Sequence, residues 1–130
     1  MGACYSAEIR VRFKDEKKAI EVIKDYISKD ERTDYGLSER KEQGIGTNSF
    51  DDLMKIFFAD HKSSHVKKNI DTCFTTYSHD FDASYGWEGV IVGMFQTIAP
   101  YLEDNSRLYL NPDNEELVLL VKNGQCMEEE

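Results

Sequence analysis

The segment from His79 to Glu88 reads HDFDASYGWE and contains most of the residue types that catalytic and metal sites use. Asp80 and Asp82 are two residues apart, as in the D-x-D motif of one class of phosphatases, in which one carboxylate is the nucleophile and the other transfers protons. A histidine beside two carboxylates is also a donor set for a transition metal. One interpretation is therefore a small hydrolase or a metal-dependent enzyme centred on His79, Asp80 and Asp82.

The rest of the sequence weighs against such a site. Residues 71–130 contain two basic residues against 12 acidic ones, and their field would repel a phosphate dianion. An EF-hand that began at Asp80 would need glycine and glutamate where the chain has Tyr85 and Ile91. His61 and His65 have the spacing of two helical metal ligands, but the polar, basic segment around them is typical of exposed histidines. We therefore expect no catalytic residue, no metal and no cofactor.

The same segment has a structural interpretation. Residues 71–81 are rich in Thr, Tyr, Phe and Cys, which predicts a strand. Apolar residues spaced by three and four from Trp87 onward predict a helix that ends near Pro100. Asp82 or Ser84 would cap this helix, because a polar N-cap side chain accepts a bond from the free amides of the first turn. We favour this interpretation and expect partner contacts at five of its residues: Asp80, Asp82, Tyr85, Trp87 and Glu88.

Periodic segments on both sides of this junction define further elements. Residues 5–13 alternate between apolar and polar side chains, which predicts a strand with one solvent-facing side. Apolar spacings of three and four predict a helix capped by Asp15 that runs to about residue 29, and a second helix capped by Ser49. Residues 106–110 and 116–122 predict a hairpin, and Asn123 with Gly124 predicts a tight turn before a short edge strand. Gly89 and Gly93, four apart in the predicted helix, indicate the close approach of a neighbouring backbone.

These elements predict a single α+β domain over residues 1–130. The expected order is β-α-α-β-α-β-β, a two-layer sandwich in which helices cover one face of a mostly antiparallel sheet of four or five strands. Residues 30–48 are polar and contain three glycines, so we expect a flexible connector there, with at most one turn of helix at residues 37–43. Residues 128–130 should be a frayed tail.

Charge is the most informative bulk property. The formal net charge is −9, yet residues 1–70 carry 14 basic and 13 acidic residues, so the acidity belongs to residues 71–130. An acidic surface repels nucleic acid, which is bound by neutralising its phosphates. It attracts a basic protein surface instead. This expectation requires the acidic side chains of residues 71–130 to form one patch.

Cysteine usage and hydropathy suggest the compartment. The three cysteines are far apart in the sequence and form no C-x-x-C pair, which favours a reducing cytoplasm over a disulfide framework. No apolar run reaches the roughly 20 residues that span a membrane. We therefore expect a cytoplasmic, non-enzymatic binding or regulatory module that contacts a basic protein partner, as immunity proteins and inhibitors do, and neither nucleic acid nor membrane. A homodimer that pairs edge strands near Cys126 is the alternative assembly.

The second half of the chain carries a resemblance. Its motifs are FDASYGWEGV at 81–90, APYLEDNSRLYLNPD at 99–113 and LLVKNGQ at 119–125. In these motifs residues 71–125 resemble a group of small uncharacterised bacterial proteins with a tryptophan-containing helix and a terminal hairpin. The resemblance implies a compact bacterial cytosolic domain, and it transfers no activity and no catalytic residue.

Overall fold

The computed structural model describes residues 2–44, 46–59, 65–71, 73–84, 86–112 and 116–128. The elements along the chain are β1 (Gly2–Val11), α1 (Glu16–Ser28), α2 (Glu31–Glu42), α3 (Phe50–Phe57), β2 (Lys67–Ile70), β3 (Thr75–Ser84), α4 (Trp87–Ile98), the 3-10 helix η1 (Ala99–Tyr101), β4 (Arg107–Pro112), β5 (Leu117–Lys122) and β6 (Gln125–Glu128).

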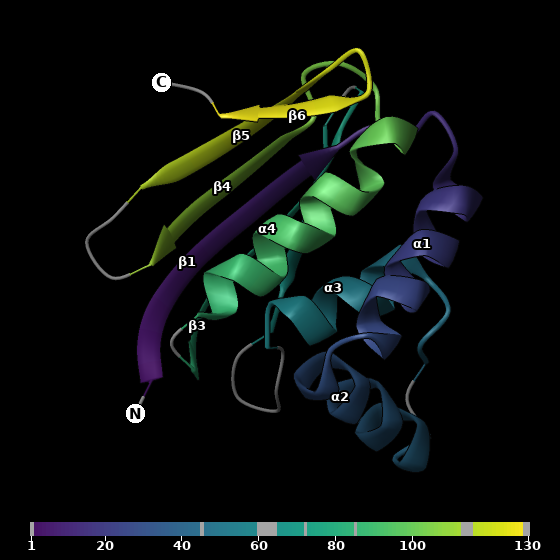
Figure 1. The fold of residues 1–130 in the computed structure, drawn as a ribbon, viewed down its shortest axis with the longest axis vertical. Coiled ribbons are helices and arrows are strands. Elements are labelled where there is room, and N and C mark those ends of the chain that lie inside the picture. Colours follow the sequence, from purple (N-terminus) through teal and green to yellow (C-terminus); the bar gives the residue numbers. More distant parts are fainter. Residues whose placement is uncertain are drawn as a thin grey trace.

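Six strands of the described residues form one antiparallel sheet in the order β2-β3-β1-β4-β5-β6 (Figure 1). The predicted α+β class with an antiparallel sheet is confirmed. The sheet is wider than the four or five strands expected, and α2 and β2 are added to the expected order. The short strand expected after Asn123 and Gly124 is β6, and both turn residues have the positive φ that a tight hairpin turn requires, 52° and 74°.

The core lies between the sheet and the helices, with α1 and α4 running across one face (Figure 1). In the middle of the sheet, Ile9 of β1 stands between Tyr77 of β3 and Leu108 of β4, and all three side chains are buried. Burying side chains of this size contributes about 1.5–3 kcal/mol each. The helices complete this core with fully buried side chains: Ile23 and Ile27 of α1, and Ile91, Met94, Phe95 and Ile98 of α4.

Two predicted helix starts are confirmed. The Asp15 carboxylate accepts a bond from the backbone N–H of Lys18 at 3.0 Å, and the Ser49 hydroxyl accepts one from the N–H of Asp52 at 3.1 Å. Each bond satisfies an amide that the first helical turn leaves without a partner.

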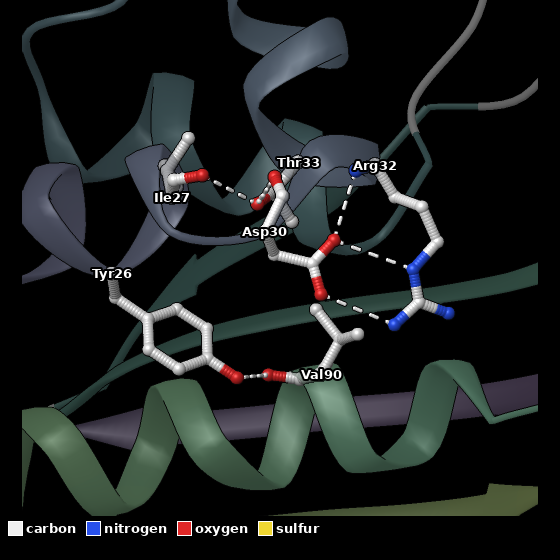
Figure 2. Close-up of polar contacts among 6 residues, drawn as sticks. All are labelled: Tyr26, Ile27, Asp30, Arg32, Thr33 and Val90. Carbon is white, nitrogen blue, oxygen red and sulfur yellow. Dashed lines mark hydrogen bonds and ion pairs between the residues drawn. The ribbon is translucent and has the colours of Figure 1, made fainter.

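The flexible connector expected over residues 30–48 is wrong, because α2 occupies most of it and begins well before the single turn of helix that the sequence allowed at residues 37–43. The Asp30 carboxylate caps α2 through the N–H of Arg32 at 2.9 Å and also accepts from the Arg32 guanidinium at 3.2 Å (Figure 2). The side-chain bond from Arg32 holds the pKa of Asp30 below its ordinary value. The Thr33 hydroxyl donates to the carbonyl of Ile27 at 2.9 Å, which ties the new helix to the end of α1 (Figure 2). Polar contacts therefore define α2, and Thr33 is its one buried residue.

The expected capping at the opening of α4 is also wrong. Strand β3 continues to residue 84, so Asp82 and Ser84 are strand residues that pair with β1. The N-cap of α4 is Gly86, whose φ of 89° lies in the left-handed region that glycine adopts without strain. Tyr85 lies outside the described residues, as do residues 113–115 of the predicted hairpin turn and residues 129–130 of the predicted tail, whereas Glu128 belongs to β6.

The two glycines of α4 differ in their surroundings. At Gly93 the close neighbour is the phenol of Tyr26 rather than the expected backbone, and the Tyr26 hydroxyl donates to the carbonyl of Val90 at 2.9 Å (Figure 2). A Cβ added at Gly93 would lie 3.0 Å from Cζ of Tyr26 and would overlap its hydroxyl, whereas a Cβ at Gly89 meets no described atom within 4 Å.

We therefore predict opposite effects for two alanine substitutions in the same helix. Gly93→Ala should lower the free energy of unfolding by about 1–3 kcal/mol, because the tyrosine must move. Gly89→Ala should raise it by about 0.5–1 kcal/mol, because alanine is the better helix former. Urea unfolding followed by circular dichroism measures both, and equal stabilisation by the two variants would contradict the close packing at Gly93.

Candidate functional site

One face of the sheet carries polar and charged side chains and, among the described residues, no helix lies over it (Figure 1). The alternation that buries Tyr5, Ala7 and Ile9 turns the intervening side chains of β1 outward, and the paired strands follow the same alternation. We call this surface the open face. Its outward side chains in the paired strands include Ser6, Glu8 and Arg10 of β1, Lys67 of β2, Thr76, Ser78, Asp80 and Asp82 of β3, Arg107 and Tyr109 of β4, and Val118 and Leu120 of β5.

A depression of about 520 Å³ lies near the middle of the open face. Glu8 and Asp80 line it from neighbouring strands, because Glu8 pairs with Ser78 and Asp80 pairs with Ser6. Diagonal neighbours of this kind are about 7 Å apart. The other lining residues include Tyr109 on one side and His65 with Lys67 on the β2 side. The depression thus holds two carboxylates within reach of one ligand group.

Most of the charge on the open face is divided between its two ends; Lys67 is the exception, because it pairs with Ser78 at the depression and so lies in the same row as Glu8. The acidic half consists of Glu8, Asp80 and Asp82, together with Glu116 just before β5. Tyr109 lies near two of these carboxylates: desolvation and then the negative charges of Glu116 and Glu8 raise the pKa of its hydroxyl. The basic half consists of Arg10, Arg107 and Lys122 with Arg12 just past β1, and Arg10 and Arg107 are direct cross-strand neighbours.

The acidic residues of the second half do not form the single patch that the sequence suggested. Asp71 pairs with Arg10 at 3.9 Å beside the basic half, and the Asp104 carboxylate accepts from the N–H of Asn123 at 2.8 Å at a turn. The acidic half of the open face instead takes Glu8 from the N-terminal strand. Among the acidic residues of 71–130 that the sequence placed in one patch, only Asp80, Asp82 and Glu116 belong to the acidic half of the open face.

The five predicted contact residues are divided between two layers. Asp80 and Asp82 lie on the open face, whereas Trp87 is 8% exposed on the helix side and donates from Nε1 to the carbonyl of Phe57 at 2.8 Å. Glu88 accepts from the Tyr5 hydroxyl at 2.8 Å. Trp87 and Glu88 therefore hold α4 against α3 and the sheet, and nothing is described for Tyr85.

The three residues of the hydrolase interpretation do not converge. His79 is 7% exposed on the helix side, where its Nδ1 lies 2.5 Å from the carbonyl oxygen of Phe58 and its ring stacks on Phe81. Asp80 and Asp82 face the other way. In the part of the chain that the structure describes, which excludes His61, no group of three or more His, Cys, Asp or Glu side chains could hold a metal ion.

Glu8, Lys67 and Tyr109 are the residues that the sequence did not single out for this surface. Glu8 could have been found from its outward position in the alternating segment, next to Arg10. Lys67 and Tyr109 depend on strand order, because β2 and β4 reach the depression only through their pairing with β3 and β1.

The chain has no match among protein-family models, curated proteins or solved structures. The resemblance of its second half to small bacterial proteins therefore stays a prediction. None of the described helices is long and apolar enough to cross a membrane, and Cys4, Cys73 and Cys126, which all lie in the described ranges, form no disulfide with one another.

The contact between Tyr5 and Glu88 predicts how stability changes with pH. Burial, followed by the bond to Glu88, raises the pKa of Tyr5 from 10.0 to about 12. This stabilisation is fully present below pH 10 and is lost as pH rises toward 12, because the unfolded chain ionises first. Tyr5→Phe should cost about 1 kcal/mol at neutral pH, since Glu88 loses its donor.

The same substitution should make the loss of stability between about pH 10 and 12 shallower by up to about 1.4 kcal/mol per pH unit. Tyr77 remains as a source of residual slope, because burial and its bond to Asp51 raise its pKa as well. Chemical unfolding at a series of pH values measures this, and superimposable pH profiles for the two proteins would contradict the assigned contact.

Proposed function

We propose that this protein is a non-enzymatic binding module that takes a basic protein partner on the acidic half of its open face. The observation that carries the proposal is the depression in which the carboxylates of Glu8 and Asp80 lie on neighbouring strands. A lysine or arginine side chain of a partner that enters it meets both carboxylates at once. An arginine guanidinium, a planar fork of donors, suits such a pair better than a lysine ammonium.

The neighbouring side chains support a protein partner rather than a nucleic acid. Asp82 extends the acidic half beyond the depression, and carboxylates repel phosphate. Tyr109 offers an aromatic ring at the wall of the depression, where it can pack on the stem of a basic side chain. An inhibitor or immunity protein works through such complementarity, by steering a basic protein to its surface and covering it.

We place this activity in a bacterial cytoplasm. Exposed thiols at Cys4 and Cys73, neither of them in a disulfide, fit a compartment that keeps cysteines reduced. A module of this kind requires no cofactor, because attracting a basic protein and covering its surface forms and breaks no covalent bond.

A pair of matched peptides tests the proposal. The probe is an acetylated, amidated peptide of alternating glycine and arginine, and its glutamate counterpart is the negative control. Wild-type protein should bind the arginine peptide, and salt should weaken the binding. Glu8→Gln/Asp80→Asn should weaken it about tenfold or more, which corresponds to about 1.4 kcal/mol. Titration followed by amide chemical shifts measures affinity and location together.

The matched control is Asp34→Asn/Glu42→Gln, which removes the same two charges from exposed positions of α2. This variant should bind the arginine peptide within about twofold of wild type, since its net charge changes equally but the open face is intact. Equal weakening in both variants, or chemical-shift changes confined to the helices, would show that only net charge matters and would overturn the proposal.

A further inference from the structure

We infer that the open face also binds a second copy of this chain, face to face, in a two-fold symmetric dimer. The inference goes beyond the proposed function, because it concerns the same surface but a different partner. It starts from the division of charge on that surface. A partner that is basic throughout would meet repulsion from Arg10 and Arg107, so a partner that covers the whole open face must present both signs of charge in a matching order.

The register of the sheet defines rows of outward side chains that run across the strands. One row contains Ser78, Glu8, Tyr109 and Val118; the next contains Thr76, Arg10, Arg107 and Leu120. Successive rows on one face are about 7 Å apart, because they are two residues apart along each strand. Along β1 the sign of charge changes between these two rows, from Glu8 to Arg10.

Consider a two-fold axis that lies in the plane of the interface, perpendicular to the strands and midway between these two rows. Rotation about this axis places the Glu8 row of one copy opposite the Arg10 row of the second copy. Glu8 then faces Arg10 of the second copy, and Arg10 faces its Glu8. Tyr109 faces Arg107, a pair of the kind that cations and aromatic rings form. Two-fold symmetry makes every such contact occur twice, as in most homodimers. Two sheets stacked this way correspond to an aligned sandwich with about 10 Å between the layers.

The same axis matches the flanking side chains. On the β5 side, Val118 faces Leu120 of the second copy, and both are only half-buried in the single chain. Met127 of β6, which pairs with Leu120, is 53% exposed and extends this apolar strip. One row further out, Glu116 faces Lys122 of the second copy. Burial of the apolar strip supplies a favourable term that does not depend on salt, while the charge pairs set the register.

Sedimentation equilibrium on the full chain tests the dimer. Wild-type protein, with a chain mass of 15.0 kDa, should approach twice that mass as its concentration rises. Glu8→Arg should sediment as a monomer, because the introduced arginine would face Arg10 of the second copy. Arg10→Glu should do the same, because it places two glutamates opposite each other. Glu16→Arg, an equal charge reversal on the exposed first turn of α1, should dimerise like wild type.

The decisive sample is an equimolar mixture of the two monomeric variants. In a Glu8→Arg/Arg10→Glu heterodimer every facing pair again has opposite signs, so the mixture should recover the dimer mass. A variant that had only lost its fold would not recover it. A wild-type protein that is monomeric at all concentrations, variants that dimerise like wild type, or a mixture that stays monomeric would each overturn the inference.

Failure of this inference and failure of the proposed function are distinguishable. A monomeric wild type that binds the arginine peptide through Glu8 and Asp80 leaves the proposed function in place with a different protein as partner. The reverse result is also possible: the mixture of the two charge-reversal variants recovers the dimer, but Glu8→Gln/Asp80→Asn binds the arginine peptide as tightly as wild type. That result supports the dimer and overturns the proposed function. If both interactions occur they compete for one surface, and the peptide should shift the equilibrium toward the monomer.

Discussion

The antiparallel pairing of β3 with β1 is the constraint on which the rest of this structure depends. Because side chains alternate along a strand, burying Tyr77, His79 and Phe81 against the helices turns Ser78, Asp80 and Asp82 to the other side. A slip of one residue would exchange the two sets and place carboxylates in the core, which fixes the register strongly. The same pairing brings Glu8 beside Asp80 and so creates the acidic depression.

This constraint explains why a segment that looks like a catalytic loop performs two separate tasks. Residues of HDFDASYGWE that face the helices hold the layers together, through the His79 contact with Phe58 and the Trp87 bond to Phe57. Those that face away contribute charge to a surface. The residue types of a site are present, but residues adjacent in the sequence lie on opposite faces of the sheet. The carboxylate that lies near Asp80 on the open face is that of Glu8 in β1, the first strand of the chain.

The sequence predicted the elements whose own residues are periodic and missed those that depend on their neighbours. Strand β1 and helices α1, α3 and α4 each carry a complete apolar pattern. Helix α2 buries only Thr33 and is defined by bonds at Asp30 and Ile27, and β2 reads KKNI with every residue exposed, so neither has a pattern to find. Surface charge was misjudged for a related reason: a balance counted along the chain ignores which strands lie side by side, and Glu8 belongs to the half of the chain that is almost neutral.

The division of the sheet into an architectural face and an open face is the central claim, and the unfolding free energy of two adjacent substitutions tests it most directly. Asp80→Lys changes an exposed outward side chain and should alter stability by no more than about 0.5 kcal/mol. His79→Lys places a charge among buried aromatic rings and should cost about 3 kcal/mol or more. Similar costs at the two positions, or a larger cost at Asp80, would contradict the account.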